Sequence, residues 1–140
     1  MNTVKWDPFH NLLNVPRFGA SSALTRSGDE RPWAPTVDIF GKDDDVFIRA
    51  ELPGVSRDDI DVSVEDGVLT LSGERKTDER FHEAGVYRRE RSYGRFKRGF
   101  AMPDTVDTDR IEARYKDGIL EIRVPKVERL KPRKIEIDAA

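Results

Sequence analysis

Few side chains in this sequence are of the types and spacing that carry chemistry. The two histidines, His10 and His82, are far apart, and neither has a second histidine at the spacing of a zinc site. The run of Asp43, Asp44 and Asp45 lacks the spaced ligands and closing glutamate of a calcium loop, so we interpret it as a solvated turn. Cysteine is absent, and no glycine-rich phosphate cradle precedes a helix. The sequence therefore predicts a protein that is not an enzyme, with no catalytic residue, metal or cofactor.

The densest cationic stretch, RRERSYGRFKR at residues 88–98, interleaves Tyr93 and Phe96 with basic side chains. Single-strand nucleic-acid binders combine aromatic and cationic side chains in this way. However, acidic residues lie nearby, and the whole chain has 25 basic and 27 acidic residues, a net charge of −2. A protein dedicated to duplex nucleic acid usually has a basic excess. We therefore interpret these arginines as partners for carboxylates across a subunit interface, and nucleic-acid binding, which would fall steeply with salt, remains a weaker alternative.

Strand patterns dominate residues 35–125. TVDIF is followed by DVFIRAEL, in which apolar residues alternate with others, and Pro53-Gly54 then breaks the chain. Two segments, DIDVSVEDGVLTLSGER and RIEARYKDGILEIRV, each contain an alternating strand, an Asp-Gly turn and an alternating return strand, the signal of a β-hairpin. Seven to nine such strands in about 90 residues predict an all-β fold, an antiparallel immunoglobulin-like β-sandwich over residues 34–126.

Residues 1–33 form a separate N-terminal arm in this scheme. Trp6, Phe9 and Leu13 recur at helical spacing beside Leu12, and Phe18 follows in a stretch interrupted by proline and glycine. We expect a partly helical or disordered arm that exposes apolar side chains, although a short helix docked on the protein's own core is an alternative. No stretch is apolar enough for a membrane span or a secretory signal, so the cytoplasm is the expected compartment.

Two further segments are unexplained by a solitary sandwich. Residues 76–94 form a long, charged connection, and a short strand at its tip, VYRRER, could pair with the sheet edge of another subunit. The C-terminal extension, residues 127–140, is charged and soluble, yet it contains Ile135 and Ile137. In an extended chain, both isoleucines point to the same side. They are interpreted as a two-pronged plug, with docking on the same chain as the alternative.

These stretches, taken in order, resemble the small heat-shock proteins, the family built on the α-crystallin domain, and in particular its bacterial and plant members. The stretches that carry the resemblance are ELPGV (51–55), GVLTLSGER (67–75), GRFKRGFAMP (94–103), ARYKDGILEIRVPK (113–126) and the Ile-x-Ile tail. In the arm, only WDPF (6–9) is similar to known openings. The resemblance implies an ATP-independent chaperone, or holdase, that binds unfolding client proteins and is assembled as a homo-oligomer of dimers. It also implies that ATP-driven chaperones refold the clients, and it implies no nucleic-acid or membrane partner.

The resemblance assigns roles to particular residues. The tail isoleucines of one dimer would fill a groove on another, while a strand in the long connection would cross to the partner subunit and the arm would supply apolar surface for clients. The tail residues are Ile135 and Ile137; the groove residues are Ile60, Val62, Val64, Ile111, Ala113 and Tyr115; the exchanged-loop residues are Val86, Tyr87, Arg88, Arg89 and Arg91; and the client-binding residues are Trp6, Phe9, Leu12, Leu13 and Phe18. The alternative is a monomeric adaptor similar to the CS-domain co-chaperones, which lack both the tail and the long connection.

Overall fold

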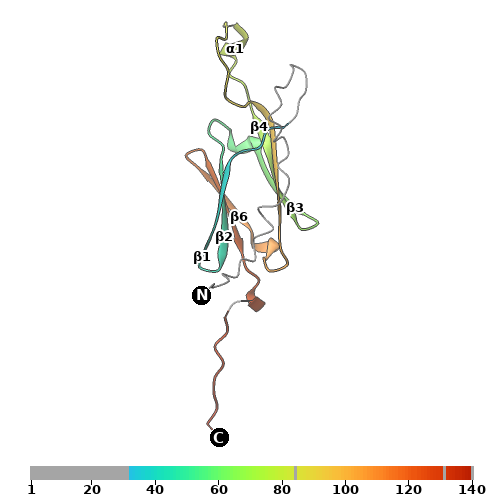
Figure 1. Ribbon diagram of the computed structural model, residues 1–140, viewed down its shortest axis with the longest axis vertical. Helices are drawn as coiled ribbons and strands as arrows, with labels where there is room; N and C mark the ends of the chain where they lie inside the picture. Colours follow the sequence, from blue (N-terminus) through green and yellow to red (C-terminus); the bar gives the residue numbers. More distant parts are fainter. Residues whose placement is uncertain (1–31, 84, 131, 140) are drawn as a thin grey trace, which may run out of the picture.

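The computed structural model describes residues 32–83, 85–130 and 132–139 of the 140-residue chain. The predicted client-binding residues of the arm, from Trp6 to Phe18, therefore lie outside the described residues. Within the described ranges the fold is nearly all β, with two antiparallel sheets facing each other, as Figure 1 shows. The predicted β-sandwich is thus confirmed.

One sheet has four strands in the order β1 (Val37–Lys42), β2 (Asp45–Glu51), β7 (Ile119–Pro125) and β6 (Glu112–Lys116), and the other has three in the order β3 (Ile60–Glu65), β4 (Val68–Arg75) and β5 (Gly94–Ala101). A single-turn helix, α1 (Arg80–Glu83), lies in the connection between β4 and β5. Short 3-10 turns occur at Arg57–Asp59, Thr108–Arg110 and Glu128–Leu130.

The three tight turns are of the kind that the sequence indicates. Asp66 and Gly67 have φ values of 50° and 73°, and Asp117 and Gly118 have φ values of 53° and 77°. Two successive positive φ angles are typical of the type I′ turn, whose twist matches that of the flanking strands. Asp43 (φ 51°) and Asp44 (φ 67°) form a similar turn between β1 and β2.

The core consists of the alternating residues that face inward from both sheets. The β2 stripe that the sequence predicts is buried, because Ile48 and Ala50 have no exposed surface and Val46 has only 2%. Cross-strand pairing places the same face of β7 beside it, with Ile48 opposite Ile122 and Ala50 opposite Leu120. The other sheet contributes Leu69 and Leu71 from β4 and Phe96 and Phe100 from β5, all buried.

Trp33 holds the start of the described chain against β5. Its backbone N–H donates to the carbonyl of Arg95 (3.1 Å), and its carbonyl accepts from the N–H of Lys97 (3.0 Å). Its indole Nε1 donates to the carbonyl of Gly94 (3.1 Å), and its ring lies 5.2 Å from that of Phe96. These contacts cover part of the β5 edge and fix the place where the arm enters the sandwich.

Candidate functional site

The candidate site consists of the segments that the sandwich leaves without a partner: the C-terminal tail, two edge strands and the long connection between β4 and β5. Figure 1 shows the connection and the tail leaving the sheets at opposite ends of the molecule. In the described part of the tail after position 131, residues 132–139 form no helix or strand. Ile135 is 75% exposed and Ile137 is 95% exposed. Two large apolar side chains are therefore fully available to another surface.

The predicted groove residues, apart from Ile111, lie on two edge strands, β3 and β6. Cross-strand pairing sets their direction: Val62 lies opposite Leu71 and Tyr115 lies opposite Leu120, both of which are buried. The groove side chains therefore point toward the space between the sheets. Half-buried members pack against the core, while Val64 and Ala113 are exposed; the half-buried members are Ile60, Val62, Ile111 and Tyr115. Ile111 belongs to the segment just before β6 and not to the strand itself.

Tyr115 connects β6 to the segment that leads into β3. Its hydroxyl lies 2.7 Å from the carbonyl oxygen of Leu52 and 2.8 Å from that of Val55, so it can donate to either. Partial burial raises the pKa of the Tyr115 phenol, which keeps the hydroxyl protonated as a donor. The Tyr115 hydroxyl thus helps to hold β6 against the segment that enters β3, together with the hydrogen bond from the N–H of Leu52 to the carbonyl of Gly118 (2.8 Å).

We expect Tyr115→Phe to destabilise the domain by about 1–2 kcal/mol, because two partly buried carbonyl groups lose a hydrogen-bond donor. The free energy of unfolding in urea measures this loss. Tyr93→Phe is the matched control. Among the described residues, the Tyr93 hydroxyl accepts a hydrogen bond from the exposed Arg91 side chain (3.1 Å), and its removal should change stability by less than about 0.5 kcal/mol. Equal midpoints for the two variants would show that the Tyr115 hydroxyl does not support the edge.

The connection between β4 and β5 is folded around Arg89. Its guanidinium lies 4.4 Å from the ring of Tyr93 and 5.4 Å from that of Phe81, and it donates to the hydroxyl of Thr77 (3.0 Å). Val86 and Tyr87 remain exposed, and the strand expected in VYRRER does not form in the single chain, where residues 85–93 have no strand. The five predicted exchange residues are thus presented on one projecting loop, without a partner strand.

The arginines of this loop are engaged within their own chain. Arg88 forms an ion pair with Glu90 (3.0 Å), while Arg91 donates to the Tyr93 hydroxyl. The sequence-based interpretation assigned them to carboxylates of another subunit. These exposed local contacts are weak, so they can be exchanged for others in an assembly.

Arg75, at the base of the loop, is a contributor that the sequence analysis missed. It is only 7% exposed, its guanidinium lies 4.4 Å from the ring of Trp33, and it donates to the carbonyl of Ser92 (2.9 Å). Burial lowers the pKa of Arg75, and the positive charge of Arg91 lowers it further. The inward direction of the Arg75 side chain could have been predicted from the sequence, because Arg75 continues the inward alternation of Leu69 and Leu71 along β4.

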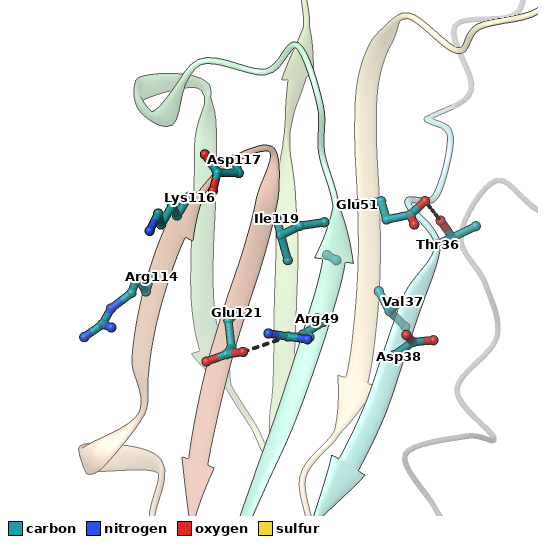
Figure 2. A pocket seen from close by; sticks show the side chains of 11 residues that line it. Thr36, Val37, Asp38, Arg49, Glu51, Arg114, Lys116, Asp117, Ile119 and Glu121 are labelled. Carbon is teal, nitrogen blue, oxygen red and sulfur yellow. Dashed lines mark hydrogen bonds and ion pairs between the residues drawn. The ribbon is translucent and has the colours of Figure 1, made fainter.

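A hollow of about 420 Å³ lies on the outer face of the four-stranded sheet, shown in Figure 2. An ion pair between Arg49 and Glu121 (2.8 Å) crosses it, and Thr36 donates to Glu51 (2.9 Å) at one side. The lining also includes the charged side chains of Arg114, Lys116 and Asp117. Among the described residues, no group of three or more His, Asp or Glu could hold a metal ion. No helix in the described ranges is long and apolar enough to cross a membrane.

Comparison with known proteins assigns this arrangement to a family. The model of the Hsp20/alpha crystallin family matches residues 38–138. The small heat shock protein C4 of Rickettsia felis is 33% identical over 131 residues, covering 94% of this chain and 78% of the relative. The 17.0 kDa class II heat shock protein of Zea mays is 37% identical over 148 residues, covering 100% of this chain and 96% of the relative.

A crystal structure of a small heat-shock protein from Xylella fastidiosa, described as revealing a distinct high order structure, has the same fold. It superposes with a TM-score of 0.62 at 39% identity and covers 76% of this chain and 98% of that one. The two facing sheets, the long connection and the match that runs through the tail lead to one conclusion: this chain belongs to the Hsp20/alpha crystallin family of small heat shock proteins, which are chaperones and not enzymes.

Proposed function

We propose that this protein is an ATP-independent holdase that acts in the cytoplasm as a homo-oligomer of dimers and binds unfolding proteins through exposed apolar surface. The observation that carries the proposal is the exposure of Ile135 and Ile137 on an extended, otherwise charged tail. Apolar side chains of this size are unfavourable in free energy when water surrounds them, and burial against a partner removes that unfavourable term. A monomeric adaptor would gain nothing from them.

In this proposal, each single tail–groove contact is weak. Full burial of one isoleucine is worth about 1.5–3 kcal/mol, and the ordering of the tail and loss of freedom on association reduce that value. One tail therefore binds and releases readily, whereas many tails in one assembly hold it together through multivalency. Heat or a competing client can then open individual contacts, which exposes the inward stripes of β3 and β6 to an extended apolar segment.

The proposed dimer forms when residues 86–91 of one subunit pair with β1 of its partner. Two features support this proposal. β1 is an edge strand with no further strand beside it in the described chain, and an unpaired edge of this kind readily accepts an added strand. The loop carries Val86 and Tyr87 with their side chains exposed, and its own contacts are weak enough to be exchanged.

Client capture is assigned to the apolar residues of the arm together with any groove freed of its tail. The charged remainder of the chain, 37% of all residues, would keep a client complex in solution. Transfer of the client to ATP-driven chaperones completes the proposed cycle.

The test of the proposed activity is the heat-induced light scattering of an unrelated, thermally labile enzyme in buffer without ATP. An equimolar amount of the chaperone subunit should suppress most of the scattering, and added ATP should make no difference. A cysteine-free carrier protein at the same mass concentration is the control. If several clients aggregate as fast with the correctly assembled protein as with the carrier, the holdase proposal fails.

The dimer proposal has its own test in the variant Tyr87→Pro/Arg88→Pro. Proline removes a backbone N–H donor, and two consecutive prolines remove one from each edge of a paired strand, because successive N–H groups point to opposite edges. Neither residue lies in a strand of the single chain, so the sandwich should remain folded while the dimer dissociates to monomers. Sedimentation velocity measures the change. Tyr87→Ala/Arg88→Ala keeps both donors and should remain dimeric, and an unchanged proline variant would exclude pairing through this segment.

A further inference from the structure

The outer face of β6 carries a charge pattern of which the sandwich uses only Glu112 among the described residues. Residues 112, 114 and 116 point away from the core, since they lie opposite Arg123, Glu121 and Ile119 on the outward side of β7. Glu112 makes a long contact to Arg123 (3.3 Å) and stays 73% exposed. Arg114 and Lys116 have no ion pair within the described ranges, and Figure 2 shows both reaching away from the Arg49–Glu121 pair.

The tail carries the reverse pattern. With Ile135 and Ile137 pointing inward, Lys134, Glu136 and Asp138 must point outward, because side chains alternate along an extended chain. All three are exposed, and they form no ion pair in the part of the chain that the structure describes. Along β6 the outward charges run minus, plus, plus from residue 112 to 116, and along the tail they run plus, minus, minus from residue 134 to 138.

We infer that the tail of a second copy lies along β6 in the parallel direction, with Glu136 beside Arg114 and Asp138 beside Lys116. The inference rests on the proposed tail–groove contact and adds its direction and register. Lys134 then lies beside Glu112, so every facing pair has opposite charges. Inside the groove, Ile135 lies beside the small, exposed side chain of Ala113, and Ile137 lies beside Tyr115.

The other alignments are worse in identifiable ways. An antiparallel tail with Glu136 beside Arg114 sets Asp138 against Glu112 and Lys134 against Lys116, and like charges on neighbouring strands are destabilising. Placing Glu136 beside Glu112 fails in either direction for the same reason. A parallel tail with Glu136 beside Lys116 sets Lys134 against Arg114.

One antiparallel alignment avoids like charges, with Glu136 beside Lys116 and Asp138 beside Arg114. It places Ile135 beside Asp117, which lies in the turn after β6, beyond the apolar stripe. One isoleucine would then lose its groove. Of these alignments, only the parallel one with Glu136 beside Arg114 pairs opposite charges and also keeps both isoleucines in the groove.

The chain has no cysteine, so engineered cysteines report the register directly. Full-length Asp138→Cys is co-expressed in turn with Glu112→Cys, Arg114→Cys or Lys116→Cys, and the assemblies are oxidised under mild conditions. A disulfide forms only where the Cα atoms come within about 4.4–6.8 Å. Linked pairs of different chains are identified by mass spectrometry, with each single-cysteine protein alone as the control.

The parallel register predicts that the 138–116 pair gives the most linked product. Predominant linkage of 138 to 114 or to 112 would indicate an antiparallel or shifted tail and overturn the inference. Absence of linkage in all three mixtures would also overturn it, and Ile135→Ala/Ile137→Ala then separates the causes. If that variant still disassembles, the tail binds elsewhere, whereas an unchanged native mass means that the proposed tail function itself has failed.

A charge reversal provides an independent readout. Lys116→Glu should weaken the tail contact by about two- to fivefold, the range for an exposed ion pair, and Asp138→Lys in the same chain should restore it. The fraction of dissociated subunits on a sizing column measures both changes. Restoration by Glu136→Lys but not by Asp138→Lys would contradict the parallel register.

Discussion

Replacing Ile135 and Ile137 with alanine is expected to reduce the native mass of the assembly toward that of a dimer. Each substitution removes three carbon atoms from a side chain that the proposal buries in a groove, at about 0.8 kcal/mol per carbon. Together they are expected to weaken each tail contact by up to about 3–5 kcal/mol, which corresponds to about a 100- to 4000-fold loss of affinity. Light scattering on a sizing column measures the mass of the intact and substituted proteins side by side.

The matched control is Ile135→Val/Ile137→Val, which keeps both branched apolar side chains and removes only one methyl group from each. It should retain most of the intact mass. A large assembly that is unchanged by the alanine substitutions would move the assembly role to the N-terminal arm. A monomer in both proteins would favour the adaptor similar to the CS-domain co-chaperones.

Gly73→Ala, which adds one methyl group, is expected to be the most destabilising of the glycine-to-alanine substitutions in the two sheets. A Cβ atom at this position would lie 2.0 Å from the backbone oxygen of Asp59 and 2.5 Å from the Cζ atom of the Phe96 ring. Phe96 is buried opposite Gly73, and a backbone oxygen cannot move aside as a flexible side chain can. We expect a loss near the upper end of the range for overpacked cores, about 3 kcal/mol, and a fall in Tm of about 10–25 °C.

Gly41→Ala serves as the control for this prediction. Gly41 also lies in a strand, but the nearest atom to its added Cβ is 3.8 Å away, an ordinary contact. Its Tm should remain within a few degrees of that of the unchanged protein. Thermal unfolding followed by circular dichroism compares the two variants, and similar melting temperatures would show that the close packing around Gly73 is relaxed in solution.

The hairpins could be predicted from the sequence because their signals are local. The alternation of Ile60, Val62 and Val64 and the Asp-Gly turn that follows lie within a few residues of each other, and the same holds for the hairpin around Gly118. A pattern with a period of two fixes which side chains point inward, and the buried stripes of β2, β4 and β7 confirm it.

The assignment of strands to sheets could not be predicted, because it depends on pairing between distant residues. β2 pairs with β7, so that Ile48 lies opposite Ile122, and no local pattern encodes that choice. The burial of Arg75 has the same origin, since Trp33 reaches it only after the start of the domain has paired with β5.

The residues of the candidate site also fall into those with a local sequence signal and those that depend on contacts between distant residues. The tail isoleucines were recognisable because two large apolar residues in a charged extension have no local partner. In the single chain VYRRER forms no strand, which agrees with a segment that has too few apolar residues to form one without a partner edge. The charge pattern on the outer face of β6 could not be interpreted from the sequence, because the interpretation depends on β6 being the edge strand of its sheet.

The central claim, that this chain holds unfolding proteins without ATP, is tested most directly by the mass of the particles that form when a client unfolds. The chaperone and a heat-labile enzyme are heated together in ATP-free buffer, cooled and separated on a sizing column with light scattering. If the holdase proposal holds, soluble particles form that are heavier than the chaperone assembly alone and contain both proteins. A client that precipitates, or that stays soluble but elutes apart from the chaperone, would contradict it.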